Sequence, residues 1–183
     1  FETRHFGHTL HARTFRQNPR NERERQVCEA CHGPGSAHVA DTANRELLIG
    51  YPRRWGTPVA TQNAQCLTCH QGRQRIFWPG SAHASAEVAC SDCHNPHSGK
   101  LRAEGNAVCA TCHLASKYDT EQHSHHTPDS AGAQCVACHM PTTNYMVVDP
   151  RHDHSIRVPR PDQSVTLGVP NACNQCHAKR SAT

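Results

Sequence analysis

The pentapeptide Cys28-Glu-Ala-Cys31-His32 decides the fold, because its spacing returns five more times along the chain. The other copies are Cys66-Leu-Thr-Cys69-His70, Cys90-Ser-Asp-Cys93-His94, Cys109-Ala-Thr-Cys112-His113, Cys135-Val-Ala-Cys138-His139 and Cys173-Asn-Gln-Cys176-His177. Together the six copies use all 12 cysteines, and a histidine follows every pair at once. A pattern this regular indicates one chemistry repeated six times.

The spacing of these motifs is that of c-type haem attachment. Two thiols about one helical turn apart can each form a thioether to one vinyl group of a haem, and the next residue then brings its imidazole under the iron. Paired cysteines also bind zinc or form disulfides, but neither alternative explains a histidine directly after every second cysteine. The sequence therefore predicts six covalently bound c-type haems, each with its motif histidine as an iron ligand.

The histidines outside the motifs are the candidates for the second axial ligand of each iron. The chain has 17 histidines, and those outside the motifs are His5, His8, His11, His38, His83, His97, His123, His125, His126, His152 and His154. Only Met140 and Met146 offer a thioether instead, so bis-histidine ligation throughout is the economical interpretation. The predicted distal ligands are His11, His38, His83, His97, His126 and His154. Within the clusters 5–11, 123–126 and 152–154 the residues alone leave the choice open.

Local repetition supports this interpretation. Pro34-Gly35-Ser36-Ala37-His38 returns letter for letter as Pro79-Gly80-Ser81-Ala82-His83, which suggests a turn reused to present an imidazole beside a haem. His97 follows His94 by three residues, too close to bind the same iron from the other face, so we expect it to serve a neighbouring haem. The ligands would then cross-link the haems.

The chain has little material for an ordinary core. Leu, Ile, Val and Phe number 7, 3, 11 and 4 among 183 residues, about 14%, whereas a share below about 20% is typical of chains that do not fold on apolar burial alone. Haems would supply the missing apolar mass, so we expect haem insertion and folding to be one event. Successive motifs begin 38, 24, 19, 26 and 38 residues apart, which leaves no room for separate haem domains.

The predicted fold is therefore one hexahaem domain over 1–183, mostly coil with short α-helices and minimal β-structure, organised compactly around a stacked chain of six haems. Short helices are expected over 21–32, 86–94, 106–118 and 171–179, the last with Asn171 as its N-cap. A strand-like run covers 145–148. The 12 Pro and 11 Gly, notably around 33–35 and 158–162, favour coil elsewhere.

Charge and apolar runs exclude several classes of protein. The net charge is +4, with 16 Arg and 3 Lys, and the arginines are suited to pairing with haem propionates. Aromatic residues make up only 5% and six ferric haems would remove the positive excess, so nucleic-acid binding is not expected.

No run approaches the roughly 18 apolar residues of a membrane span. The sequence begins at Phe1 without a leader, so we expect that a targeting segment was removed or not included. Because c-type haem is normally attached outside the cytoplasm, we expect the protein to be exported to the periplasm, the cell surface or the medium.

The sequence resembles multihaem c-type cytochromes along nearly its whole length. Residues 28–38 and 90–97 are similar to periplasmic decahaem cytochromes that feed outer-membrane electron conduits. Residues 135–141, the segment 149–162 around His154 and residues 170–177 resemble the haem domain of multihaem cytochromes fused to tetratricopeptide repeats. The resemblance implies distal ligands at His11, His38, His83, His97, His125 or His126, and His154. The sequence differs from the decahaem cytochromes in having six motifs rather than ten. It also ends at Thr183, where the relatives fused to tetratricopeptide repeats continue into those repeats.

Two functions are in competition. The first is electron transfer without enzymatic activity, by a soluble carrier or by a subunit that self-associates into a filament, with redox proteins or extracellular acceptors as partners. The second is a reductase of a small oxidant such as nitrite, hydroxylamine or tetrathionate, which needs one haem with an open position beside proton donors such as His123 or His152. All six motifs end in histidine, which favours electron transfer.

Overall fold

The computed structural model describes residues 2–72, 75 and 77–181, and the chain divides into two compact units. Unit 1 comprises Phe1–Gln71 and Glu87–Arg102, and unit 2 comprises Gly72–Ala86 and Ala103–Thr183. The predicted class is confirmed, since short helices and coil dominate and the described residues form only two small sheets. The single hexahaem domain over 1–183 stays a prediction.

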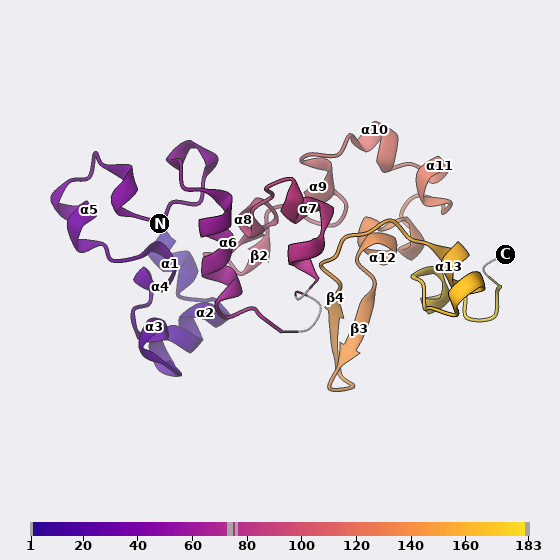
Figure 1. Cartoon of the computed structure of the whole chain (residues 1–183), viewed down its shortest axis with the longest axis horizontal. Coiled ribbons are helices and arrows are strands. Elements are labelled where there is room, and N and C mark those ends of the chain that lie inside the picture. The colour runs from indigo at the N-terminus through magenta and orange to yellow at the C-terminus, as the bar shows by residue number, and fades with distance from the viewer. Residues whose placement is uncertain (1, 73–74, 76, 182–183) are drawn as a thin grey trace. The chain divides into compact units, whose positions relative to one another are not determined.

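Unit 1 is built from short helices joined by turns, with α6 as its longest element (Figure 1). Its elements are α1 (Glu2–Phe6), α2 (Leu10–Ala12), the π-helix η1 (Arg13–Gln17), α3 (Glu22–Arg25), α4 (Glu29–His32), α5 (Ser36–Ala40), the 3-10 turns η2 (Arg45–Leu47) and η3 (Arg53–Trp55), α6 (Val59–Leu67), α8 (Cys90–Cys93), β1 (His94–Asn95) and β2 (Lys100–Leu101). Strands β1 and β2 pair antiparallel, with His94 opposite Leu101.

Unit 2 combines short helices with a β-hairpin (Figure 1). Its elements are η5 (Trp78–Gly80), α7 (Ala82–Ser85), α9 (Ala107–Ala110), α10 (Ala115–Tyr118), α11 (Glu121–Ser124), η6 (Ala131–Ala133), α12 (Cys135–His139), β3 (Thr142–Tyr145), β4 (Asp149–His152), α13 (Pro161–Leu167) and η7 (Cys173–Gln175). The register of the hairpin places Thr142 opposite His152 and Tyr145 opposite Asp149.

The predicted helices are shorter than expected. Val27 and Glu87 have φ of 53°, so 21–32 splits into α3 and α4, and 86–94 is helical only over α8. Residues 106–118 split into α9 and α10, and 171–179 holds only η7, although the Asn171 side chain accepts the Asn174 N–H as a cap would. Single turns have little intrinsic stability, so their ends are set by packing and attachment rather than by propensity.

The ribbon expected at 145–148 is wrong in its boundaries. Met146 and Val147, with φ of 49° and 72°, form the turn of the hairpin, and the strands lie on either side of it. Helix α13 begins with Pro161 at its first turn, inside the stretch 158–162 that was expected to be coil. Helix α6 was not predicted at all.

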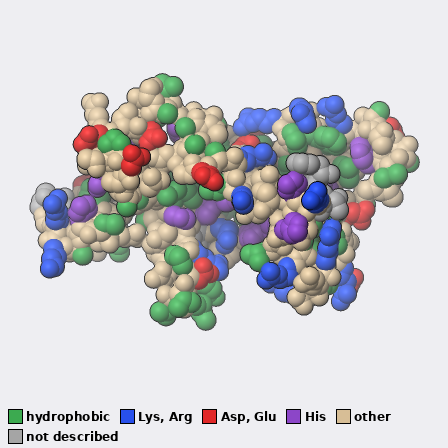
Figure 2. Space-filling view, turned by 180° about the vertical axis from the view of Figure 1, so that it is seen from behind, with side chains coloured by type: hydrophobic (Ala, Val, Ile, Leu, Met, Phe, Trp, Pro, Cys, Tyr) green, Lys and Arg blue, Asp and Glu red, His purple; other side chains and the backbone are tan. Residues whose placement is uncertain are grey.

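The described residues bury few apolar side chains. The buried ones are Ala12, Ala30, Trp78, Ala89 and Val108, most of them small. Large apolar side chains such as Leu10, Val39, Val147 and Val148 are exposed, and hydrophobic side chains are spread over the face seen in Figure 2. The low apolar content of the sequence thus corresponds to the lack of a large aliphatic core among the residues that the structure describes. Among the described residues, no helix is both long and apolar enough to cross a bilayer.

Candidate haem sites

Each cysteine motif forms a single helical turn, as its spacing predicts. In four copies the histidine N–H donates to the carbonyl of the first cysteine, at 3.0 Å in His32–Cys28, 2.9 Å in His70–Cys66, 2.9 Å in His113–Cys109 and 2.8 Å in His177–Cys173. His94 makes the same bond to Cys90, and the remaining motif lies within α12. All 12 cysteines are free, and all are exposed or half-buried. The thiols are therefore accessible for thioether formation.

The imidazoles meet in pairs, and each pair joins one motif histidine to one histidine from elsewhere in the same unit. The pairs are His11 with His70, His32 with His97, His83 with His113, His123 with His139 and His126 with His177, with ring centroids 5.9, 5.9, 5.9, 6.1 and 5.8 Å apart. Within the described residues, no group of three or more His, Cys, Asp or Glu side chains is placed to hold a metal ion. Paired imidazoles, rather than clusters of four ligands, characterise these sites.

The spacing of the pairs fits an iron held between two imidazoles. A bond of about 2 Å from the metal to each ring nitrogen puts the two ring centres about 6 Å apart when the rings bind from opposite sides. The Nδ1 atom of His83 is buried and has no hydrogen-bond partner among the described residues, and burial lowers the pKa of His83. A lowered pKa favours the neutral imidazole, which is the form that binds metals. The residues present fit a six-coordinate haem iron.

Backbone carbonyls orient several of these rings. Nδ1 of His32 lies 2.9 Å from the Ile49 carbonyl, Nδ1 of His139 lies 3.0 Å from the Arg157 carbonyl, and Nδ1 of His126 lies 2.7 Å from the Ser124 carbonyl. Because a carbonyl oxygen only accepts, Nδ1 carries the proton and Nε2 keeps its lone pair for a metal.

The distal candidates are distributed as follows. His11, His83, His97 and His126 each face a motif imidazole, whereas the ring of His38 lies 6.1 Å from Trp55. His154 points its Nδ1 at the His152 carbonyl, 3.0 Å away. Its pKa is lowered, chiefly by burial. The motif histidine His94 opens β1.

Within the cluster 123–126 the sequence favoured His126 and named His123 only as a possible proton donor, so the position of His123 beside a motif imidazole was not predicted. The structure places its ring 6.1 Å from that of His139 with the planes only 7° apart. The sequence feature that could have indicated this is the spacing of three residues between His123 and His126, because it lets one cluster place a ring beside each of two motif histidines.

An arginine-lined cavity adjoins His154. It measures about 320 Å³ and is lined by Arg75, Asp149, Pro150, Arg151, His152 and His154. Arg151 also pairs with Asp149 at 2.5 Å and lies over the Tyr145 ring. Guanidinium groups beside an imidazole are the combination that suits a haem with its propionates. Other arginines are taken by carboxylates of the chain itself, as in Arg157–Asp153 and Arg160–Asp162, so the arginine excess serves both purposes.

Tyrosine rings pack edge-on against several of the paired imidazoles. The Tyr51 ring stands edge-on to His32 at 5.3 Å, and its hydroxyl donates to the Cys31 carbonyl. Tyr118 stands edge-on to both His113 and His123, at 5.8 and 5.4 Å. Such contacts restrict the rotation of the ligand rings.

Attachment motifs, each formed as one helical turn, and facing imidazole pairs are the features of multihaem c-type cytochromes, and comparisons with known proteins find the chain similar to this class. The family described as cytochrome c-type protein NrfB-like matches residues 28–105. The chain is 31% identical over 157 residues to the multiheme cytochrome MtrA of Shewanella baltica (strain OS185). The match covers 84% of this chain and 42% of that relative, so the chain spans less than half of the relative's length.

Proposed function

We propose that this chain carries electrons through six bis-histidine c-type haems and has no catalytic haem. The single observation that supports this most strongly is the set of five facing imidazole pairs, because two ligands on an iron leave no position for a substrate. The bound haems would supply reversible one-electron carriers.

The residues that would hold the haems follow from the pairs. Thioethers would form at the 12 motif cysteines, and the motif histidines would bind iron from one side. His11, His83, His97, His123 and His126 would bind from the other side. One of the six irons is then left to supply, and His38 or His154 remains the sequence-based prediction for its distal ligand.

The proposed setting is outside the cytoplasm, because thioether attachment of haem takes place there. Within that setting the chain would serve as a carrier between redox proteins or as a subunit of a polymeric filament. Negative-stain micrographs and a sizing column distinguish these two forms: filaments favour the second and a monodisperse monomer the first.

Haem counting and electron paramagnetic resonance test the proposal. Absorbance of the pyridine haemochrome per mole of chain is expected to give six haems, and the oxidised protein is expected to show only low-spin ferric signals. The pair His123–His139 has nearly parallel rings and the pair His11–His70 has planes 78° apart, so signals of markedly different anisotropy are expected together. A stoichiometric high-spin signal would instead support the reductase, and fewer than six haems would refute the haem count.

A further inference from the structure

Two asparagines occupy the same place in two different motifs. Asn63 stands three residues before Cys66, and Asn106 stands three residues before Cys109. On a helix this spacing puts the asparagine and the cysteine on one face. The corresponding position of the other four motifs holds Arg25, Glu87, Gly132 and Pro170.

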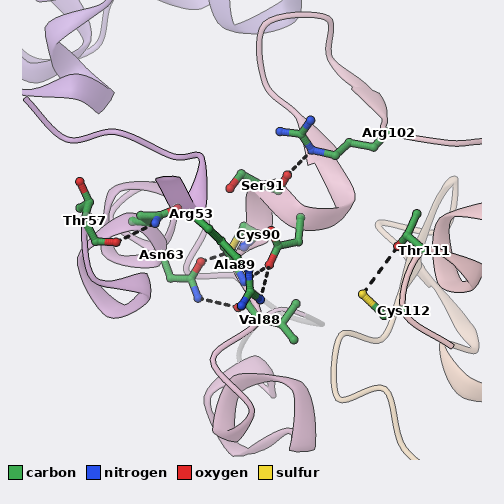
Figure 3. Close-up of polar contacts among 12 residues, drawn as sticks. Arg53, Thr57, Asn63, Val88, Ala89, Cys90, Ser91, Arg102, Thr111 and Cys112 are labelled. Carbon is green, nitrogen blue, oxygen red and sulfur yellow. Dashed lines mark hydrogen bonds and ion pairs between the residues drawn. The ribbon is translucent and has the colours of Figure 1, made fainter. Parts of the chain in front are cut away.

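The Asn63 side chain forms two hydrogen bonds with the backbone at the beginning of the next motif, as Figure 3 shows. Its side-chain nitrogen donates to the Val88 carbonyl at 3.0 Å, and its side-chain oxygen accepts from the Cys90 N–H at 2.8 Å. Asn63 is buried, so neither bond competes with bulk water. The two bonds tie α6, which carries Cys66, to the first turn of α8.

Asn106 repeats the arrangement in unit 2. Its side-chain nitrogen donates to the Ala133 carbonyl at 3.0 Å, and its oxygen accepts from the Cys135 N–H at 2.8 Å. The same nitrogen also donates to Asp119 at 2.8 Å. In both units the asparagine thus holds the first cysteine of the following motif and the carbonyl two residues before it. We call these two arrangements the asparagine clamps.

Each clamp brings two cysteines of different motifs together. The Cys66 side chain interacts directly with that of Cys90, and the Cys135 side chain with that of Cys109. All four are the first cysteines of their motifs. Because a haem would be anchored at each of these sulphurs, fixing two sulphurs side by side fixes how closely two haem edges approach.

We propose that Asn63 and Asn106 are positioning residues that hold the haems of successive motifs as two closely coupled pairs, one at Cys66 and Cys90 and the other at Cys109 and Cys135. The proposal rests on the proposed function, since it concerns haems attached at these cysteines. Electron exchange between two haems weakens steeply as their edges separate, so a side chain that fixes the attachment points determines how strongly the pair is coupled.

The experiment compares the holoprotein with variants Asn63→Ala, Asn106→Ala and the double variant. Two closely coupled haems give a bisignate circular dichroism couplet in the Soret band, and haem content is measured on the same samples. Each single variant is expected to keep six haems and lose part of the couplet. The double variant is expected to lose the sum of the two parts, because the clamps share no residue. Asn144→Ala, at an exposed position of β3, is the control that should leave the couplet unchanged.

If an alanine variant fails to take up six haems, the variants Asn63→Asp and Asn106→Asp test the positioning role of the two asparagines instead. An aspartate keeps the acceptor for the cysteine N–H and loses the donor to the carbonyl, so full haem content with a partly reduced couplet is expected. A couplet of unchanged amplitude in fully loaded variants would overturn the proposal and leave the clamps a purely structural role. Failure of the proposed function is seen separately, as fewer than six haems or a high-spin signal in the unaltered protein.

Discussion

The two copies of Pro-Gly-Ser-Ala-His have one sequence and two structures. In the first copy Ser36 is the first residue of α5, and His38 packs beside Trp55 with its Nδ1 3.4 Å from the Asn44 carbonyl. In the second copy Ser81 precedes α7, and His83 faces the motif imidazole of His113 at 5.9 Å. An identical pentapeptide therefore does not by itself bring its histidine to face a motif imidazole.

The flanking residues explain the difference. Gly33, with φ of 75°, precedes the first copy, and the Gly35 N–H then donates to the Glu29 carboxylate at 2.7 Å. Trp78 precedes the second copy and is buried, and its carbonyl accepts from the Ser81 N–H. A buried indole anchors the second copy in its unit, whereas the first copy is held by a side chain at the surface.

Removing the imidazoles gives the largest expected contrast between the copies. His83→Ala deprives the motif histidine His113 of its facing ring, so one haem in six is expected to lose its low-spin signal. His38→Ala removes a ring that faces tryptophan instead, and the low-spin signals are expected to stay complete. Spin counting by electron paramagnetic resonance on both variants measures the difference. Equal losses in the two variants would show that His38 is a ligand, as the sequence similarity predicts.

Replacing the serines gives a smaller contrast. The Ser81 hydroxyl accepts the Ala84 N–H at 3.1 Å as an N-cap, and its side chain is buried, whereas Ser36 makes no cap bond. Ser81→Ala is expected to lower the free energy of unfolding by about 1 kcal/mol, and Ser36→Ala by much less. Guanidinium unfolding of the two holoproteins, followed by far-ultraviolet circular dichroism, measures this. A larger loss for Ser36→Ala would contradict the assigned caps.

The motifs were predictable from the sequence because attachment chemistry fixes their spacing within one helical turn. Four distal candidates, His11, His83, His97 and His126, face motif imidazoles as their prediction requires, although ligation itself stays a proposal. The role of His123 was not predictable, because within a cluster of three histidines only tertiary packing decides which rings meet.

Helix boundaries were the least predictable part of the fold. Val27 and Glu87 adopt positive φ, which nothing in their residue types indicates. The ends of such short helices depend on long-range contacts, which override local propensity. The sequence does show an asparagine three residues before two of the motifs, at positions 63 and 106. Their hydrogen bonds to Cys90 and Cys135 could not be predicted, because these partners lie 27 and 29 positions further along the chain.

The smallest expected effect concerns the surface bond that holds the first copy. Glu29→Ala removes the acceptor of the Gly35 N–H, an exposed hydrogen bond worth at most about 1 kcal/mol. Since about 1 kcal/mol corresponds to a factor near five in an equilibrium, the Gly35 amide is expected to exchange its hydrogen up to about fivefold faster, while the Ser81 amide, bound to the Trp78 carbonyl, keeps its rate. Glu46→Ala, at another exposed carboxylate of unit 1, is the control and should change neither amide. An unchanged Gly35 amide in Glu29→Ala would mean that the first copy is held by its own turn, and that the two copies differ through Trp78 alone.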